Sequence, residues 1–391
     1  MPEEKKEPVL RYLSAQERLQ SRELWEEAFP EDSREFADYY FAEKTKDNRI
    51  LVLEEEGRID SMIQLNPYLL QVKDEQWMSD YLVGVATRKN RRHRGYMRRL
   101  LARMMTDMRA EKMPFCFLMP ADEAIYRPFG FTFIFDQPRL GWRDGPGEFE
   151  RIPVQLRGEK VQWGGADAQA EAVSLFEAAA AFMNRWLADR YQVYAVRDAA
   201  YVERLVKEIA SENGTLDMVM DDGRMIGLES FWGLTKKAQR LLYAGDSYVR
   251  EVKKPKPAIM ARIIDVERFV TVISLKPQAE EAEKALVLEL EDPLIPDNDG
   301  TWKWVLDHYG SKLKRMTDVA EGQKLSAAEL VSQKPAEGRP EESGTEEASP
   351  ALSLTITELT AWLFGYDIPA AAAAFADVIQ PLQGVFLDEV V

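Results

Sequence analysis

A strand that runs into an arginine-rich loop and then into a long amphipathic helix constrains this fold more than any other feature. The segment "DYLVGVAT" is an apolar run that predicts a strand ending near Thr87. Seven of the twelve residues from Arg88 to Arg99 are Arg or Lys, although the chain as a whole carries a net charge of −16. Gly95 lies within this basic stretch. From Met97 onward, Met and Leu recur at helical spacing and predict one apolar stripe. A second strand follows in "PFCFLMP", so the order predicts a parallel βαβ crossover.

Three interpretations of the basic stretch compete: a nucleic-acid patch, a solvated helix start and a phosphate cradle. The acidic remainder of the chain and the lack of a known recognition fold disfavour nucleic acid. Cations at a helix N-terminus oppose the helix dipole, so a merely solvated helix start carries an electrostatic penalty. A cradle uses the free N–H groups of the first helical turn, and Gly95 lets a phosphate approach. Neither G-x-x-x-x-G-K-S/T nor G-x-G-x-x-G is present.

Length and composition predict two or three globular domains with substantial cores, because the chain has 391 residues of which 46% are hydrophobic. The lone Cys116 excludes an intrachain disulfide and a cysteine zinc site, and two histidines, His93 and His308, leave little room for a metal. No metal site is therefore expected. We expect no signal peptide and no membrane span, and thus a cytoplasmic protein. The acidic balance favours cationic or neutral partners over nucleic acid.

The remainder of the chain alternates helix and strand patterns. Residues 15–45 predict two helices, and a Gly-Arg turn near position 57 predicts a hairpin. The segment "AQAEAVSLFEAAAAFM" predicts another helix, and "KALVLELEDPLIPDNDGTWKWVLD" predicts a hairpin with an Asn-Asp-Gly turn. An acidic, Ser-, Pro- and Ala-rich segment over about 321–350 predicts a disordered loop. The apolar end "VFLDEVV" predicts a C-terminus that is buried in the protein.

At this point the motifs resemble those of a known family. "VGVATRKNRRHRGYMRRLL" resembles motif A of the GNAT N-acetyltransferases: Gln or Arg, two residues of any kind, Gly, one further residue, and Gly or Ala. Here Arg92 and Gly95 match, whereas Met97 stands at the last position, a departure typical of the enhanced-intracellular-survival (Eis-like) acetyltransferases. "AIYRPFGF" resembles the next motif of that family, and "PAIMARIIDV", "DNDGTWKW" and "LTAWLFGY" resemble its C-terminal part.

The resemblance implies an α+β fold of tandem GNAT-like domains, each a mixed sheet with flanking helices, plus a C-terminal sterol-carrier-like α+β domain. We expect a catalytic GNAT domain at 1–147, a second, degenerate GNAT-like domain at 148–285 and a sterol-carrier-like domain at 286–391. The third domain would contain the acidic loop around 321–350 and a buried C-terminus.

The resemblance further implies an enzyme with acetyl-CoA as co-substrate. The strand would hold the pantetheine arm through its backbone, and the loop would hold the pyrophosphate, largely through main chain. The expected cofactor-binding residues are Val83, Val85, Ala86, Arg91, Arg92, His93, Arg94, Gly95 and Tyr96.

Acetyl transfer to an amine also needs an acid for the departing thiolate and a base for the amine. Tyr126 matches the family's general acid, and its alternative is an aromatic ring that merely packs beside Phe129 and Phe131. The family resemblance implies the C-terminal carboxylate of Val391 as the base. A terminal strand without catalytic function is the alternative, and Glu389 or Asp388 could replace Val391 as base.

The acceptor implied is a primary amine of a cationic small molecule, such as an aminoglycoside or a polyamine, or the side chain of a protein lysine. Neither nucleic acid nor membrane is an expected partner, and the resemblance implies a homo-oligomer, a hexamer. A lipid- or small-molecule-binding protein that uses the sterol-carrier-like domain is the rival function. The candidate substrate-binding residues, which otherwise belong to a helical core, are Trp25, Phe29, Phe36 and Tyr39.

Overall fold

The computed structural model describes residues 7–143, 149–155, 160–162, 172–316 and 351–389. The acidic segment predicted to be disordered lies in 317–350, outside the described residues, as does the Gly-Pro-Gly near 145–147. The chain forms two compact units: unit 1 comprises Met1–Met104, Phe135–Ile259 and Phe386–Val391, and unit 2 comprises Met105–Ile134 and Met260–Val385. The division into three domains at 147 and 285 stays a prediction.

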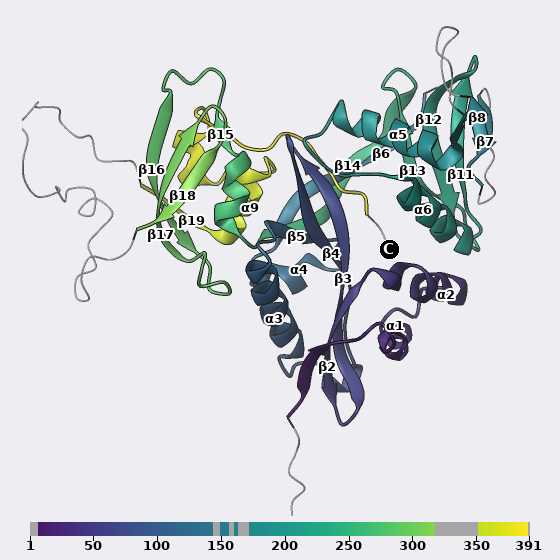
Figure 1. The fold of residues 1–391 in the computed structure, drawn as a ribbon, viewed down its shortest axis with the longest axis horizontal. Helices are drawn as coiled ribbons and strands as arrows, with labels where there is room; N and C mark the ends of the chain where they lie inside the picture. The colour runs from purple at the N-terminus through teal and green to yellow at the C-terminus, as the bar shows by residue number, and fades with distance from the viewer. Residues whose placement is uncertain (1–6, 144–148, 156–159, 163–171, 317–350, 390–391) are drawn as a thin grey trace, which may run out of the picture. The chain divides into compact units, whose positions relative to one another are not determined.

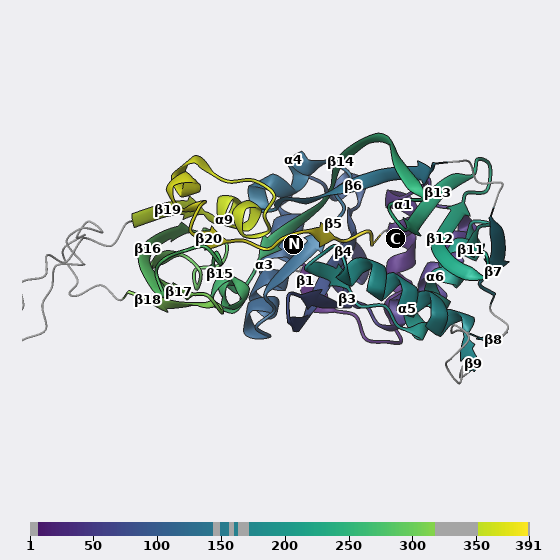
Figure 2. The same cartoon turned by 90° about the horizontal axis from the view of Figure 1, so that it is seen from above.

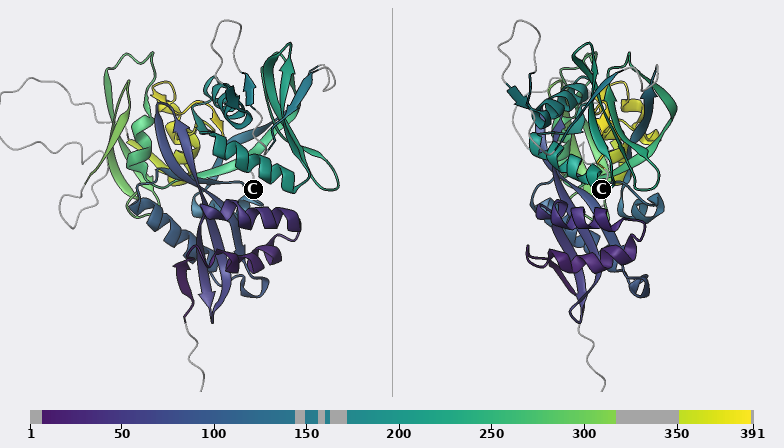
Figure 3. Two further views of the ribbon diagram at one scale, coloured as in Figure 1. Left: turned by 45° about the vertical axis from the view of Figure 1, so that its right-hand side comes forward. Right: turned by 90° about the vertical axis from the view of Figure 1, so that its right-hand side faces the viewer.

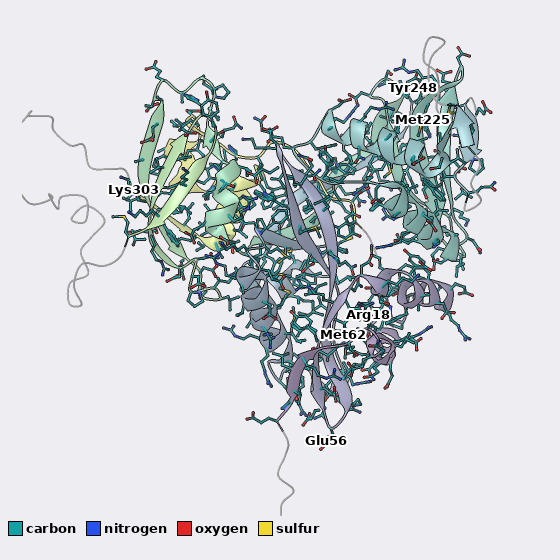
Figure 4. The ribbon with its side chains drawn as sticks, in the orientation of Figure 1. Arg18, Glu56, Met62, Met225, Tyr248 and Lys303 are labelled. Atoms are coloured by element: carbon teal, nitrogen blue, oxygen red, sulfur yellow. The ribbon has the colours of Figure 1, made fainter. Side chains whose placement is uncertain are left out.

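The first part of unit 1 is an antiparallel sheet with two helices beside it (Figures 1 and 3). The sheet order is β1-β2-β3-β4. The Glu-Gly turn between β2 and β3 carries Glu56 and Gly57, both with positive φ, and Glu56 lies at its tip (Figure 4). The elements are β1 (Val9–Tyr12), η1 (Arg18–Ser21), α1 (Arg22–Ala28), α2 (Arg34–Ala42), η2 (Lys44–Lys46), β2 (Arg49–Glu55), β3 (Arg58–Val72), β4 (Glu75–Thr87), η3 (Lys89–Arg91) and α3 (Tyr96–Ala110).

The second part of unit 1 is a four-stranded antiparallel sheet in the order β13-β12-β11-β7, against which α5 and α6 pack side by side (Figures 1 and 2). The short strand β10 pairs with β3, and β21 pairs with β10, so both join the first sheet. The elements are β7 (Glu150–Pro153), β8 (Lys160–Gln162), β9 (Ala172–Ser174), α5 (Leu175–Ala188), β10 (Val193–Ala195), α6 (Ala199–Ser211), β11 (Thr215–Asp221), β12 (Arg224–Trp232), β13 (Ala238–Ala244) and β21 (Val385–Phe386).

The helix predicted from "AQAEAVSLFEAAAAFM" begins later and ends later than the pattern suggests. Ser174 and Glu177 form a capping box, in which each side chain accepts from the other residue's backbone N–H. This cap starts α5 at Leu175, and the helix continues through Trp186 to Ala188. The alanine-rich run predicted a helix, but the cap residue determined where it starts.

Unit 2 contains a strand pair and a separate four-stranded sheet. The strand β5 pairs antiparallel with the end of β14, and the second sheet has the order β18-β17-β16-β19. The long strands β6 (Thr132–Trp142) and β14 (Val249–Ile263) each run from one unit into the other along the chain. The other elements are β5 (Phe115–Leu118), α4 (Glu123–Tyr126), η4 (Arg127–Phe129), α7 (Val266–Phe269), η5 (Val270–Val272), β15 (Ser274–Leu275), β16 (Glu283–Glu291), β17 (Gly300–Asp307), β18 (Ser311–Arg315), β19 (Ala351–Thr355), α9 (Ile356–Leu363), η6 (Ala370–Phe375) and β20 (Ile379–Gln380).

The predicted hairpin with the Asn-Asp-Gly turn is confirmed as β16 and β17. Side chains along β17 alternate as period-2 patterning requires: Trp302 and Trp304 are fully buried, whereas Lys303 between them is exposed and labelled on this strand in Figure 4. The helix α9 packs beside this sheet, and the ring of Trp362 lies 6.1 Å from that of Trp304. The core of this sheet is therefore built around tryptophans.

Candidate active site

The basic stretch connects the end of β4 to the start of α3 within unit 1. Between them lie η3 and two residues with left-handed backbone, His93 (φ +63°) and Gly95 (φ +76°). The first intrahelical bond of α3 runs from the N–H of Arg99 to the carbonyl of Gly95. The N–H groups of Tyr96, Met97 and Arg98 therefore have no intrahelical acceptor, as in any first helical turn.

Two of the cations in this stretch, Arg88 and Arg91, pair with carboxylates of the fold rather than face solvent. Arg88 is buried and bonds Glu23 and Glu27 of α1, at 2.9 and 2.7 Å. Arg91 contacts Asp60 and Glu55, each at 2.9 Å. The guanidinium of Arg88 and the N–H of Lys89 hold the pKa of the Glu27 carboxyl below its usual value, the N–H having the larger effect. This pairing explains part of the local excess of positive charge.

The residues that follow are exposed and keep their charge available. Arg92, His93 and Arg94 all lie at the surface, and Arg92 makes only a long bond, 3.3 Å, to the carbonyl of Thr87. A Cβ added to Gly95 would meet no atom within 4 Å, so the space in front of this backbone is open. Tyr96 is buried, and its hydroxyl donates to Glu55. Exposed guanidinium groups beside open backbone at a helix start fit a pyrophosphate group.

The strand before the loop carries a β-bulge near the expected pantetheine site. The pairing of β3 with β4 shifts register beside Val83, where Gly84 has a positive φ of +58°. Val83 and Val85 are half-buried, whereas Ala86 is buried and its carbonyl accepts from the Ser61 hydroxyl at 2.9 Å. A Cβ on Gly84 would approach the Trp25 ring to 2.7 Å, so close packing against this ring favours glycine here.

Tyr126 belongs to unit 2, at the end of the short helix α4. Asp122 caps that helix by accepting from the N–H of Ala124. The Tyr126 side chain is buried beside Phe131, with ring centroids 6.0 Å apart, and burial raises its pKa to about 12. Gly130 of the same motif has φ +79°, and a Cβ there would collide with the buried Arg262. The motif thus holds a protonated phenol on a tightly fixed backbone.

Of the four aromatic residues expected at the acceptor side, three belong to one buried core cluster of unit 1 and the fourth, Phe29, is half-buried and packs against that cluster. Two of the four also line a cavity. Phe36 and Tyr39 are buried within that cluster. Trp25 and Phe29 pack with ring centroids 4.8 Å apart and line an open cavity of about 700 Å³. The Trp25 Nε1 donates to Asp32 at 2.9 Å, and burial raises the pKa of that carboxyl. Glu26, Asp32 and Asp38 line this cavity together with Arg22 and Arg34. Arg22 pairs with both Glu26 and Asp38, at 2.7 and 2.6 Å.

The apolar end of the chain is buried as far as the structure describes it. The predicted burial of Val385, Phe386 and Leu387 is confirmed. Val391, the proposed base, lies outside the described residues. The two acidic residues before it are both engaged by the buried Arg197.

Asp388 and Glu389 make short contacts with side chains of unit 1. Arg197 lies 3.0 Å from Asp388 and 2.7 Å from Glu389. Tyr243 donates to Asp388 at 2.5 Å, and Tyr201 donates to Glu389 at 3.1 Å.

Sequence reasoning missed the carboxylates that organise the loop, namely Glu55, Asp60 and the α1 pair Glu23 and Glu27. The α1 pair is spaced four residues apart on a helix, which is the only signal that the sequence offered. Among the described residues, no group of three or more His, Cys, Asp and Glu side chains is placed to hold a metal ion. No helix in this part of the chain is long and apolar enough to cross a membrane.

Two parts of the chain match known protein families. Residues 9–134 match the acetyltransferase (GNAT) domain family, and residues 266–384 match the sterol carrier protein domain family. No curated protein matches the chain in sequence. The mixed α+β fold with a C-terminal sterol-carrier-like domain is thereby confirmed.

Solved structures share the fold along almost the whole chain. A probable N-acyltransferase of unknown function from Enterococcus faecalis is 13% identical, covering 97% of this chain and 100% of its own, with a TM-score of 0.67. A GCN5-related N-acetyltransferase from Kribbella flavida is 14% identical (98% and 99%, TM-score 0.65). Eis1 from Mycobacterium abscessus is 15% identical (98% and 100%, TM-score 0.62). At these identities the likeness concerns the fold.

Acetyl-CoA is the acetyl donor of GNAT domains, and the loop from Arg92 to Tyr96 lies inside the matched range. The chain is therefore an enzyme that carries a GNAT acetyltransferase domain at residues 9–134 and a sterol carrier protein domain at residues 266–384.

Proposed function

We propose that this enzyme is an Eis-like N-acetyltransferase that moves the acetyl group of acetyl-CoA to a primary amine. The acceptor would be a cationic small molecule, aminoglycoside-like or polyamine, or a lysine side chain. The observation that carries the proposal is the loop before α3, where exposed Arg92 and Arg94 flank the open backbone of Gly95. The net charge of −16 favours a cationic acceptor.

In the proposed reaction, the acceptor nitrogen attacks the acetyl carbonyl carbon, a C–N bond forms and the C–S bond breaks. Tyr126 donates its phenolic proton to the departing sulfur. A pKa raised to about 12 keeps this phenol protonated at neutral pH, which an acid requires. Following the resemblance, we assign the proton leaving the amine to the Val391 carboxylate. Asp388 and Glu389 are weaker candidates because Arg197 neutralises both.

The pyrophosphate of acetyl-CoA is proposed to lie against Arg92, His93, Arg94, Gly95 and Tyr96, and its pantetheine arm along Val83, Val85 and Ala86. In this proposal Arg91 contributes through its backbone, because its side chain already contacts Glu55 and Asp60. Trp25 and Phe29 would contact the acceptor, with Phe36 and Tyr39 supporting them from the core. We also propose a cytoplasmic homo-oligomer, a hexamer as the resemblance implies.

A screen of amine acceptors with release of the CoA thiol as readout tests the function. We expect transfer to at least one amine, and we expect Tyr126→Phe to lower kcat about a hundredfold while acetyl-CoA affinity stays unchanged. Tyr309→Phe is the matched control, because Tyr309 is 95% exposed and outside the motif. Lack of acetyl-CoA binding in calorimetry, with lipid binding instead, would favour the rival function of the sterol carrier domain. Equal turnover by Tyr126→Phe and wild type would remove Tyr126 as the acid.

A further inference from the structure

A cavity in unit 1 gathers charged and amide side chains that the proposed acetyl transfer does not use. Its volume is about 230 Å³. Its lining residues include members of η2, β3, α6, β13 and the segment after β21. The helix α2, which precedes η2, packs against α6 (Figure 1). No residue of the loop from Arg92 to Tyr96 lines it. Three of its residues, Lys44, Asn66 and Glu208, are buried with unmet bonding capacity.

Asn66 of β3 is 1% exposed, and neither the oxygen nor the nitrogen of its carboxamide makes a hydrogen bond of normal geometry. The amide does lie near the Tyr40 hydroxyl. Burial raises the pKa of that hydroxyl, and the nearby Asn66 amide lowers it by a smaller amount. A buried amide without partners is rare, because each unmet donor or acceptor costs about 1–3 kcal/mol. A ligand or an ordered water inside the cavity would supply such an amide with partners.

Lys44 is a buried cation without a carboxylate partner in the described part of the chain. Its Nζ donates to the Tyr68 hydroxyl at 2.6 Å and lies 4.9 Å from the centre of that ring. Burial lowers the pKa of the ammonium, against the attraction of Glu208 and Glu389. A buried ammonium whose only hydrogen bond is to a neutral hydroxyl is poorly compensated.

Glu208 of α6 is the matching poorly compensated anion. Its closest cation is Arg240, whose Nη2 lies 3.6 Å from Oε1, and this oxygen accepts no hydrogen bond. Burial raises the pKa of the carboxyl, and the charge of Arg240 offsets this only in part. The carboxyl therefore retains capacity for a donor from inside the cavity.

The other acidic residues that line the cavity already have partners. Asp47 pairs with Arg204, Asp198 caps α6 by accepting from the N–H of Tyr201, and Glu389 pairs with the buried Arg197. Side chains of both charges thus line one small cavity. Among them, the cation Lys44 and the anion Glu208 are the poorly compensated pair.

We propose that this cavity binds a small zwitterion of amino-acid size, with its carboxylate at Lys44, its ammonium at Glu208 and a further polar group at Asn66. The size follows from the volume, because pockets for drug-sized ligands measure roughly 300–1,000 Å³. The charge pattern follows from the two poorly compensated groups. A purely cationic ligand would leave Lys44 poorly compensated, and a purely anionic ligand would leave Glu208 poorly compensated. The ligand supplies both missing charges at once.

Calorimetric titration of the full-length enzyme with single L-amino acids tests the proposal. Two matched probes accompany each amino acid: its N-acetyl form, which lacks the ammonium, and its amide, which lacks the carboxylate. We expect at least one amino acid to bind with one site per chain and both derivatives to bind about tenfold or more weakly. Absence of binding by every amino acid at millimolar concentration overturns the proposal. Equal binding of the amide overturns the role of Lys44.

Matched variants locate the site. Lys44→Met and Glu208→Gln are each expected to weaken amino-acid binding about tenfold or more. Lys46→Met and Glu203→Gln alter exposed residues of the same two helices and are expected to leave it unchanged. If Lys44→Met does not fold, Glu208→Gln decides, because it keeps the size of the side chain. Unchanged binding by a folded Glu208→Gln overturns the assignment. Acetyl-CoA affinity, measured separately, should stay constant throughout, so a failure here is distinct from failure of the acetyltransferase proposal.

Discussion

At the residue scale, burial decides how each charged group behaves. Arg88 is buried and fully matched by carboxylates, so its charge stabilises the fold. Lys44 is equally buried, and within the described residues its ammonium donates only to the Tyr68 hydroxyl, so its charge costs stability. Arg88 and Lys44 therefore have opposite effects on folding stability, although both are buried basic residues. Their partners in the folded chain account for the difference.

Replacing Lys44 with Met should stabilise the free enzyme at pH 7 by roughly 1 kcal/mol, because it removes an uncompensated buried charge. The folded-state pKa of Lys44 lies below its ordinary 10.5. Between these two values the unfolded state binds more protons, so wild-type stability rises with pH in that window. The advantage of Lys44→Met should therefore shrink as the pH approaches 10.5. Urea unfolding at pH 7 and pH 9.5 measures this, with Lys46→Met as control, and a Lys44→Met protein less stable at pH 7 would contradict it.

At the element scale, the basic stretch has two parts with different tasks. The part formed by Arg88 and Arg91 ties the end of β4 to α1, β2 and β3, whereas Arg92, His93 and Arg94 project to the surface before α3. Arg91 and Arg92 are adjacent in sequence, so the sequence alone does not show that the first is paired with carboxylates and the second is exposed.

Substitutions at the two parts should separate stability from binding. Arg88→Ala removes the buried cation that contacts Glu23, Glu27 and Asp60 and should cost about 1–3 kcal/mol of unfolding free energy. Arg92→Ala should cost less than about 0.5 kcal/mol yet weaken acetyl-CoA binding. Denaturant unfolding and calorimetry on both variants check this. Comparable unfolding midpoints for the two variants would show that the division is wrong.

The sequence predicted most elements because their signals are local. Alternation and an Asn-Asp-Gly turn identified β16 and β17, and the methionine and leucine stripe identified α3. The bulge at Gly84 could not be predicted, since the packing of Trp25 against that glycine involves residues far apart in the chain. The start of α5 at Leu175 was missed because a single cap residue decides it.

At the scale of the whole molecule, long-range contacts create what the sequence could not reveal. Lys44 and Glu208 line one cavity although 164 positions separate them in the numbering, and Glu389 of the terminal segment lines it too. The candidate loop, by contrast, is contiguous in sequence and could be identified from its motif. Local motifs therefore identified the proposed cofactor site, whereas the zwitterion cavity required the folded chain.

The proposed role of the Val391 carboxylate makes a prediction about the end of the chain. Appending three glycines after Val391 moves the carboxylate away and should lower turnover at least about tenfold while acetyl-CoA affinity is retained. A variant with three glycines inserted before Glu7 is the control for added length. Full turnover by the folded, extended enzyme would exclude the terminal carboxylate as base.

The most direct test of the central claim is a calorimetric titration of acetyl-CoA into wild type, Gly95→Ala and Gly223→Ala. Both glycines have φ +76° and open space where a Cβ would stand, so both variants carry the same backbone strain. Only Gly95 lies in the proposed pyrophosphate loop. We predict tight binding by wild type and Gly223→Ala, and affinity about tenfold or more lower for Gly95→Ala. Equal affinity for all three proteins, or no binding by wild type, would contradict the assignment of this loop to acetyl-CoA.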